Sequence, residues 1–368
     1  GVVTAASYEV RALGVRSGMS IAEARRLAPD AVYLPTRHGV YGPYAEQVRE
    51  LLFTGTDQVQ TASIDEFFLD FRGCEAVWAR PDDRDADATI VRRIREIRDA
   101  IQAEIGLPAS AGLGTTRAIA KMASRLAKPA GVFAVPGGGE RAFVDPQPVR
   151  AFPGIGPMTE AALVDAGVTT LGALLELPPG PLRVRFGGLA ESVRRAIDGS
   201  QVPSLGADRP AFHEHDAEGS AVGSISNERT FHADLADRSR VNDQVRGLVE
   251  RVCWRARRRG VVARTVTLKL RTSDFHTVSR SESGPPSASE HELLPRAFRL
   301  IDVAWTRELP VRLVGVALSN LVLAPPQLGL PFPATRRPPV GAAIDAVRDR
   351  FGYDAIRLGA TGTTSWIA

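Results

Sequence analysis

The stretch TASIDEFFLD, Thr61–Asp70, holds two adjacent carboxylates among isoleucine, leucine and two phenylalanines. In a flat strand, neighbouring side chains point to opposite faces, so Asp65 and Glu66 could not serve one ion from mid-strand. At the end of a hairpin with residues 59–63 and 67–71 as its arms, both carboxylates reach the same edge. Their repulsion and lost solvation then require a cation, which predicts a Mg²⁺ site completed by substrate phosphates. The alternative is an exposed turn whose carboxylates are merely solvated.

The composition indicates a globular chain of several domains. Its 368 residues suggest two to four domains, and 44% hydrophobic residues is an ordinary fraction. No apolar run approaches the length of a membrane span. Two isolated cysteines, Cys74 and Cys253, fit a reducing compartment and cannot build a disulfide framework. We therefore expect a cytoplasmic protein without membrane contact.

Positive charge is concentrated in one part of the chain. The net charge is +4 and the pI is near 9.4. Residues 220–325 contain 17 Arg or Lys and 11 Asp or Glu, a net charge of +6, so the remainder carries −2. A locally basic domain on a near-neutral body favours a polyanionic partner, although a solvated charged face would give the same count.

Apolar periodicity predicts two α+β units separated by a region of short helices and glycine turns over 152–198. In the first unit we expect strands at 2–6, 59–63, 67–71, 109–113 and 132–135, and helices at 20–27, 41–53, 90–105 and 116–126. Ser20 is expected to be the N-cap of the first of these helices. In the second we expect strands at 226–231, 261–273, from 277 onward and at 311–321, and helices at 239–258 and 290–305. A short helix at 342–351 is expected in a Pro-rich tail. Hairpins as well as crossovers indicate the α+β class.

Five motifs in order make the chain similar to a known family. SIDEFFLD (63–70) resembles the catalytic hairpin of the Y-family translesion DNA polymerases, in particular their DNA polymerase IV branch. Four more resemble that family's fingers, palm helix and turn, thumb, and start of the little finger: SYEVRALGVRSGMSIAEARRLAPDAVYLP (7–35), AKMASRLAKPAG (120–131), FPGIGPMTEAALVDAGVTTLGAL (152–174) and SISNERTF (224–231). The resemblance covers Val2 to about Leu323.

The resemblance implies a multidomain right-hand polymerase of the α+β class. Its divisions would be fingers with the end of the first palm strand (1–37), palm (38–147), helix-hairpin-helix thumb (148–203), linker (204–222), little finger (223–324) and a tail with a clamp-binding motif (325–368). Its activity would be template-directed addition of deoxynucleotides to a primer 3′ end, with low fidelity, on damaged template. A monomeric, cytoplasmic, nucleoid-associated protein is implied as well.

The resemblance implies that Asp65 and Glu66 are ligands of two Mg²⁺ ions. These ions would clamp the primer 3′-oxygen and the leaving pyrophosphate. The family's third carboxylate lies on an N-terminal strand that has no counterpart here, nor does the bulky residue that excludes ribonucleotides. By ordinary element lengths, on the order of thirty to forty residues are missing. We therefore expect weak or no primer extension from the chain as given.

Three residues match the family's triphosphate-binding positions. Tyr8 and Arg11 form a Tyr-x-x-Arg at the end of the first expected strand, where Arg suits a bidentate grip on phosphate. Lys128 stands in the Ala-Lys-Pro-x-Gly turn. Only three of the 46 basic residues are lysines, which draws attention to Lys121 and Lys128, seven positions apart. Lys121 would support the site or contact a phosphate; a solvated helix lysine is the alternative.

DNA contacts are expected in two places. The Pro-Gly-Ile-Gly turn of Gly154, Ile155 and Gly156 precedes a helix, where bare N–H groups can bind a DNA phosphate without reading sequence. A tight turn without a ligand is the alternative. In the second unit, four basic residues are expected to hold duplex backbone in a salt-sensitive way, namely Arg229, Arg264, Lys269 and Arg271. A solvated face remains the alternative for each.

The tail carries a segment that resembles the bacterial sliding-clamp-binding peptide. Leu330 and Phe332 would enter an apolar pocket while Gln327, next to Leu328, would bond at its rim. An ordinary apolar linker is the alternative.

Two rival functions remain at this point. A non-catalytic relative that scaffolds a mutagenic complex would lose the metal carboxylates, which are present here. A DNA-binding module alone would leave Tyr8, Arg11 and Lys128 unexplained.

Overall fold

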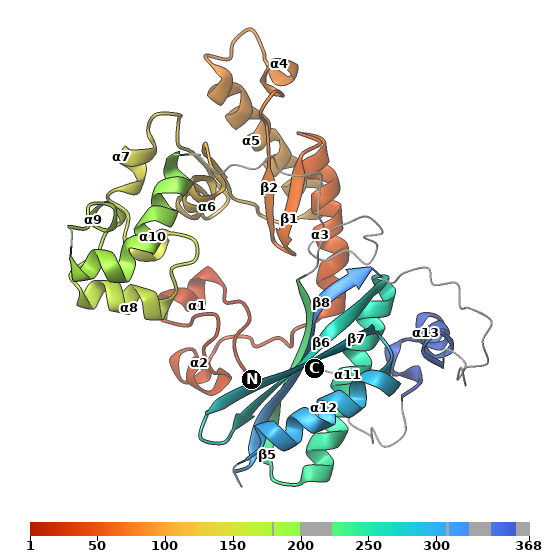
Figure 1. Cartoon of the computed structure of the whole chain (residues 1–368). Coiled ribbons are helices and arrows are strands. Elements are labelled where there is room, and N and C mark those ends of the chain that lie inside the picture. The colour runs from red at the N-terminus through yellow and green to blue at the C-terminus, as the bar shows by residue number, and fades with distance from the viewer. Residues whose placement is uncertain (179, 199–222, 307–308, 324–339, 358–368) are drawn as a thin grey trace. The chain divides into compact units, whose positions relative to one another are not determined.

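The computed structural model describes residues 1–178, 180–198, 223–306, 309–323 and 340–357 (Figure 1). The chain divides into two compact units, Gly1–Phe212 and His213–Ala368. The division falls within the expected linker, 204–222, which lies outside the described residues.

Residues 1–37 form a small helical region with a core of its own. Its helices are α1 (Tyr8–Ala12) and α2 (Ile21–Leu27). Ser20 caps α2, as predicted, by accepting a hydrogen bond from the Glu23 N–H at 3.1 Å. The buried core consists of four residues, Val3, Val15, Ala24 and Ala28.

The predicted strand at 2–6 is wrong. Val2 makes one isolated bridge with Ser20, and Val3 exchanges hydrogen bonds with the backbone of Gly18 and Met19. A strand needs a continuous ladder with a neighbour. This ladder ends at once because the partner segment turns into α2 at Ile21.

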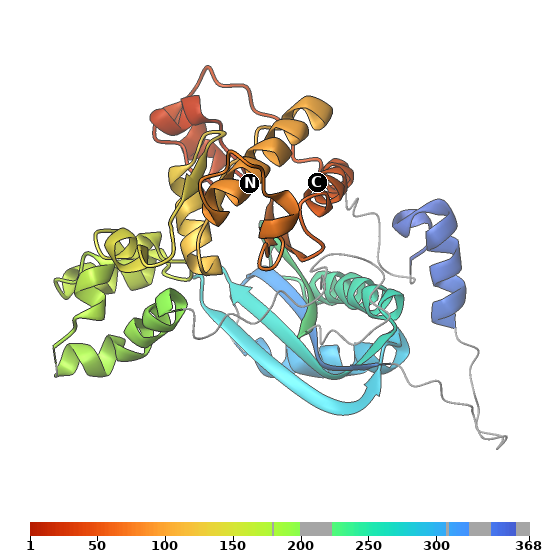
Figure 2. The same ribbon diagram turned by 90° about the horizontal axis from the view of Figure 1, so that it is seen from above.

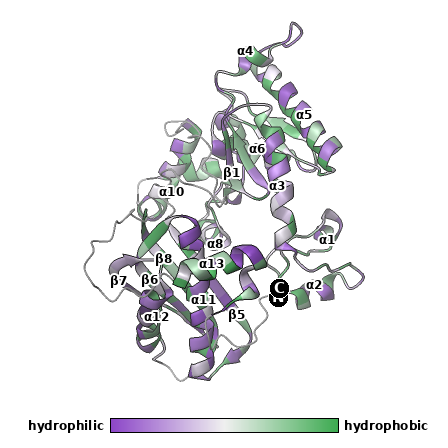
Figure 3. Cartoon of the chain, turned by 90° about the vertical axis from the view of Figure 1, so that its right-hand side faces the viewer, coloured by the Kyte–Doolittle hydropathy of each residue, from purple (hydrophilic) through white to green (hydrophobic). Residues whose placement is uncertain are grey.

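The hairpin predicted around the carboxylates is confirmed. β1 (Val59–Ser63) pairs antiparallel with β2 (Glu66–Leu69), so β2 begins one residue earlier than expected. Helices α3 (His38–Phe53), α4 (Glu75–Trp78) and α5 (Ala86–Ile105) accompany it, and α5 alternates hydrophobic with hydrophilic residues along its length (Figure 3). One core holds hairpin and helices together: Leu52, Val59, Phe71, Ile90, Ile97 and Ile101.

Helix α6 (Arg117–Leu126) connects two short parallel strands, β3 (Ala111–Leu113) and β4 (Val132–Ala134). It lies directly on β3, because a Cβ at Gly112 would stand 2.1 Å from the Ala120 carbonyl oxygen. The inner face of α6 shares a core with the helices that follow: α7 (Glu140–Val144), η1 (Val149–Ala151), α8 (Pro157–Asp165), α9 (Leu171–Leu175) and α10 (Pro181–Asp198). One core therefore crosses the predicted palm–thumb boundary at 147/148.

The second unit is a four-stranded antiparallel sheet with two long helices (Figures 1 and 2). Its elements are β5 (Ser224–Leu235), α11 (Arg238–Arg258), β6 (Val261–Thr272), β7 (Thr277–Ser287), α12 (Glu290–Ala304) and β8 (Val311–Leu323), with strand order β5-β8-β6-β7. Both helices share one core with alternate residues of the strands. The other face of the sheet carries none of that core.

The expected tail helix is confirmed as α13 (Val340–Phe351), followed by η2 (Tyr353–Ala355). It is attached to α11 by ion pairs: Asp345 bonds Arg257 at 2.6 Å, and Arg348 bonds Glu250 with both side chains buried. Across the described ranges, no helix combines the length and apolarity that a bilayer crossing requires.

Candidate functional site

The carboxylate pair lies where the hairpin turns. Asp65 is in the turn and Glu66 opens β2, aligned with Ser63 of β1. The Ser63 hydroxyl bonds the Asp65 carboxylate and also accepts from the Asp65 N–H at 3.3 Å. The turn thus releases Asp65 from the strand alternation that would have sent it to the opposite face.

Glu66 is held from the side by α6. The Lys121 ammonium lies 2.6 and 2.7 Å from the two carboxylate oxygens of Glu66. One turn earlier on α6, the Arg117 guanidinium stands 5.7 Å from the centre of the Phe68 ring. Four residues of helix and two of strand both advance by about 6 Å, so α6 can meet β2 at both points.

The predicted nucleotide-binding residues occupy helix and turn positions. Tyr8 and Arg11 lie in α1 rather than at a strand end, and Arg11 sits 5.9 Å from the centre of the Tyr8 ring. The Arg11 Nε also donates to the Ala6 carbonyl at 2.8 Å. Lys128 follows α6 in a tight turn with an exposed side chain. The Gly131 N–H closes that turn on the Ala127 carbonyl at 2.7 Å.

The helix-hairpin-helix turn has the predicted form. Gly154 has a φ of +96°, Ile155 is buried, and Gly156 is the N-cap of α8 without a side-chain cap. Pro157 has no N–H, and the first backbone bond of α8 runs from Glu160 to Gly156 at 2.9 Å. The N–H groups of the two residues between Pro157 and Glu160 therefore face outward, at the positive end of the helix dipole.

The face of the second unit's sheet that α11 and α12 leave uncovered is polar, and we call it the hydroxyl face. It carries ten hydroxyl residues in four cross-strand rows: Ser224, Ser226, Thr230, Thr265, Thr267, Thr277, Ser279, Ser281, Ser283 and Ser319. Lys269 and Arg271 project from β6 on this face, since their neighbours Leu268 and Leu270 are in the core. Short hydroxyls and two cations form a surface suited to phosphate oxygens.

The four predicted basic residues do not share this face. Arg229 alternates in phase with the buried Ile225 and Phe231, and it donates to Gln244 of α11 at 3.1 Å. Arg264 is exposed at an irregularity in the pairing of β6 with β7, between residues 263 and 265. Only Lys269 and Arg271 belong to the hydroxyl face.

Sequence reasoning missed three partners at these sites. Ser63 and Arg117 support the carboxylate hairpin, and Glu228 pairs with Lys269 at 2.8 Å. Two signals were available. Arg117 lies four residues before Lys121 and so on the same side of a helix, and the phase of the apolar residues in β5 separates Arg229 from Glu228.

The carboxylate pair suits a hard divalent cation whose other ligands come from elsewhere. The described part of the chain contains no group of three or more His, Cys, Asp or Glu side chains that could hold a metal by itself. Asp65 and Glu66 offer only oxygen, which Mg²⁺ prefers together with substrate phosphates and water. The predicted clamp-binding residues, Gln327, Leu328, Leu330 and Phe332, lie outside the described residues.

Comparison with known proteins agrees with this architecture. A model of the impB/mucB/samB family matches residues 1–125, and a model of that family's C-terminal domain matches residues 222–330. DNA polymerase IV of Dehalococcoides mccartyi is 32% identical over 98% of this chain and 88% of its own length. DNA polymerase IV of Streptomyces coelicolor is 38% identical over 87% of this chain and 64% of its own length.

Solved structures show the same fold. A chimera of the Y-family DNA polymerases Dbh and Dpo4 superposes with a TM-score of 0.73 and 21% identity, covering 88% of each chain. DinB from Sulfolobus solfataricus gives a TM-score of 0.53 with 20% identity, over 88% of this chain and 89% of its own. Together with the sequence relatives, these matches show that the chain belongs to the Y-family translesion DNA polymerases of the DNA polymerase IV type and is a DNA-directed DNA polymerase.

Proposed function

We propose that the end of the β1–β2 hairpin is the catalytic metal-binding centre, with Asp65 and Glu66 as ligands of two Mg²⁺ ions. Polymerases of this family need divalent metal ions for nucleotidyl transfer. The observation that carries the proposal is the Lys121 ammonium, which lies within 2.7 Å of both Glu66 oxygens. The Glu66 carboxylate at the hairpin end is thus already stabilised by a positive charge, as a carboxylate that binds a metal ion would be.

Each residue near the hairpin has a defined task in this proposal. Asp65 and Glu66 present oxygen ligands, and Ser63 holds the orientation of Asp65. Bound Mg²⁺ supplies charge stabilisation for the attacking and leaving oxygens. Tyr8, Arg11 and Lys128 bind the phosphates of the incoming deoxynucleoside triphosphate through a hydroxyl, a guanidinium and an ammonium.

Primer–template DNA is bound at two surfaces that do not read sequence. At the thumb, the outward N–H groups that follow the turn of Gly154, Ile155 and Gly156 donate hydrogen bonds to a backbone phosphate. In the second unit, Lys269, Arg271 and the surrounding hydroxyls contact the duplex backbone. Arg229 and Arg264 lie off that face, so their contribution to DNA binding stays a separate prediction.

The proposal extends to partners outside the catalytic reaction. The segment around Gln327, Leu328, Leu330 and Phe332 is proposed to bind the sliding clamp, on the basis of its sequence. The protein is proposed to act as a monomer in the cytoplasm, associated with the nucleoid. The related proteins are named polymerases, and no finding favours the non-catalytic scaffold.

Substitution at the hairpin tests the proposal. In the natural protein that contains this sequence, Asp65→Asn and Glu66→Gln are each expected to lower Mg²⁺-dependent primer extension by at least about a thousandfold. DNA affinity should change less than about twofold, because neither side chain belongs to a DNA-binding surface. Asp57→Asn, an exposed acid at the other end of β1, serves as the control. Extension that survives both hairpin substitutions contradicts the assignment.

A further inference from the structure

The hydroxyl face of the second unit's sheet contains one carboxylate among its described residues, and that carboxylate is paired. The Lys269 ammonium donates to Glu228 at 2.8 Å. Lys269 comes from β6 and Glu228 from β5, the edge strand, with β8 between them. One of the two cations on this face is therefore engaged by an acid of the same protein.

The strand between Glu228 and Lys269, β8, has a glycine where the two side chains meet. Gly315 of β8 is aligned with Glu228 on one side and with Lys269 on the other. A Cβ at Gly315 would stand 2.9 Å from the Glu228 Cβ. The absence of a side chain at this point leaves a path along which the pair closes across β8.

The chemistry of the surroundings makes this acid unusual. The neighbouring rows hold serine and threonine, and hydroxyl pairs such as Thr267 with Ser281 at 2.9 Å connect the strands. A carboxylate placed there repels DNA phosphates. The Lys269 and Glu228 side chains are 37% and 53% exposed, so their pair is weak and can exchange with an anion from solution.

We propose that Glu228 is an intramolecular competitor for DNA. Its carboxylate binds the Lys269 ammonium where a backbone phosphate would otherwise bind. The duplex must displace the carboxylate to contact Lys269. Glu228 thereby limits the affinity of the hydroxyl face for DNA. The inference rests on the proposed DNA-binding role of that face.

Removing the carboxylate's charge tests the inference. Glu228→Gln is compared with Glu282→Gln, which makes the same change in net charge but breaks a pair with Arg299 of α12, on the helix-covered side. Fluorescence anisotropy of a labelled primer–template of mixed sequence measures Kd from about 50 to 200 mM KCl. Glu228→Gln should tighten binding about three- to tenfold and steepen the slope of log Kd against log salt by up to about 0.9. Glu282→Gln should change Kd less than twofold, because salt screens the effect of a single surface charge that lies away from the DNA.

Lys269→Gln distinguishes the competitor role of Glu228 from the DNA-binding role of the hydroxyl face. It should weaken DNA binding, and it should weaken it more in the Glu228→Gln background, where no acid competes for the ammonium. If Lys269→Gln weakens binding but Glu228→Gln does not strengthen it, the competitor role is wrong while the DNA-binding face stands. If Lys269→Gln changes nothing in either background, the face does not bind DNA and both fail.

Discussion

Lys121 is one of only three lysines in the chain, and its position at Glu66 gives it a specific role at the proposed metal site. The ammonium neutralises the carboxylate while no other cation is near. A divalent ion that approaches Glu66 meets this positive charge. Because both side chains are partly exposed, the pair restrains the approach without preventing it.

Lys121→Met should therefore strengthen metal binding to the protein. With the competing charge removed, the Kd for Mn²⁺ is expected to fall about three- to tenfold, measured by electron paramagnetic resonance titration. Lys121→Arg, which keeps the charge, should bind Mn²⁺ like the wild type. Weaker binding in the methionine variant would mean that Lys121 positions Glu66 for the metal instead of competing with it.

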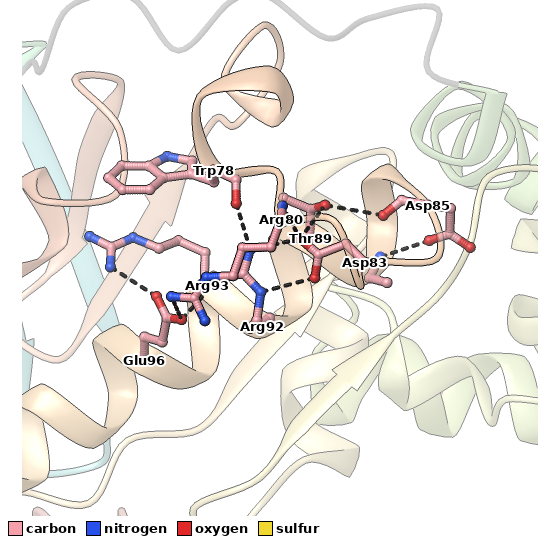
Figure 4. A network of polar contacts seen from close by, with 9 residues as sticks. Trp78, Arg80, Asp83, Asp85, Thr89, Arg92, Arg93 and Glu96 are labelled. Atoms are coloured by element: carbon pink, nitrogen blue, oxygen red, sulfur yellow. Dashed lines mark hydrogen bonds and ion pairs between the residues drawn. The ribbon is translucent and has the colours of Figure 1, made fainter.

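At the scale of elements, a polar network fastens the loop before α5 to the helix itself (Figure 4). Arg92 of α5 donates to both carboxylate oxygens of Asp83, at 2.9 and 2.7 Å. Asp83 also accepts from the Arg80 N–H at 2.8 Å and from the Thr89 hydroxyl at 3.0 Å. The loop is charged and lacks apolar residues to bury, so these bonds take the place of a core contact.

Asp83→Asn should lower the melting temperature at pH 7 by several degrees. The Arg92 guanidinium, with the Arg80 N–H and the Thr89 hydroxyl, holds the pKa of Asp83 well below its ordinary value. Ionised Asp83 thus contributes stability above the unfolded-state pKa of about 4, and this contribution declines as the pH falls further toward the lowered folded-state value. In thermal denaturation, the difference in melting temperature between wild type and variant should become smaller below about pH 4.

Asp82→Asn is the matched control for that experiment, since Asp82 lies in the same loop with an exposed side chain. It should leave the melting temperature unchanged at every pH. A pH-independent gap for Asp83→Asn would contradict the role of its ionised form.

The tail helix α13 is anchored to α11 by a buried ion pair. Neither Arg348 nor Glu250 is more than 2% exposed, and Arg348 also donates to the Ile356 carbonyl at 3.1 Å. Tyr353 packs 4.9 Å from Trp254, and burial raises its pKa to about 12. Replacing Arg348 removes the buried cation that faces Glu250 and the donor to the Ile356 carbonyl, so the attachment of the helix should weaken.

Arg348→Met is expected to release α13. Hydrogen exchange of the amides in 340–351 should accelerate at least about tenfold, while that of α11 and the sheet changes little. Arg350→Met, on the exposed side of the same helix, should leave exchange in 340–351 unchanged. Unaltered protection in the Arg348 variant would show that the Asp345–Arg257 ion pair and apolar contacts suffice to hold the helix.

At the scale of the whole molecule, the chain is built from two units with separate cores. The second unit's buried core is drawn from β5, β6, β8 and both long helices, and Val278 of β7 packs against it. The helix α13 is attached to α11 by the Asp345–Arg257 ion pair. The sheet with both helices forms a core large enough for independent stability.

Residues 213–368, prepared as a separate protein, should therefore fold by themselves. Calorimetry should show one cooperative transition at the temperature at which the second unit melts in the full chain, within about 3 °C. A broad transition without a heat-capacity step would show that the unit depends on the first. The corresponding fragment 1–198 serves as the comparison.

Much of the local structure followed from the sequence. The hairpin, the Ser20 cap and the tail helix were predicted from alternation, capping residues and helical spacing, all of which act within a few residues. The strand expected at 2–6 failed because a strand depends on a neighbour that local pattern does not supply.

The sequence by itself determined the carboxylate pair, its place at a hairpin end and the family to which the chain belongs. Only the tertiary structure brought Lys121 to Glu66 across 55 residues, and Lys269 to Glu228 across 41. The reason is physical: these contacts depend on how α6 lies along β2 and on the register of β5, β8 and β6 across Gly315. Such arrangements are decided by packing between distant segments, which periodicity along the chain does not encode.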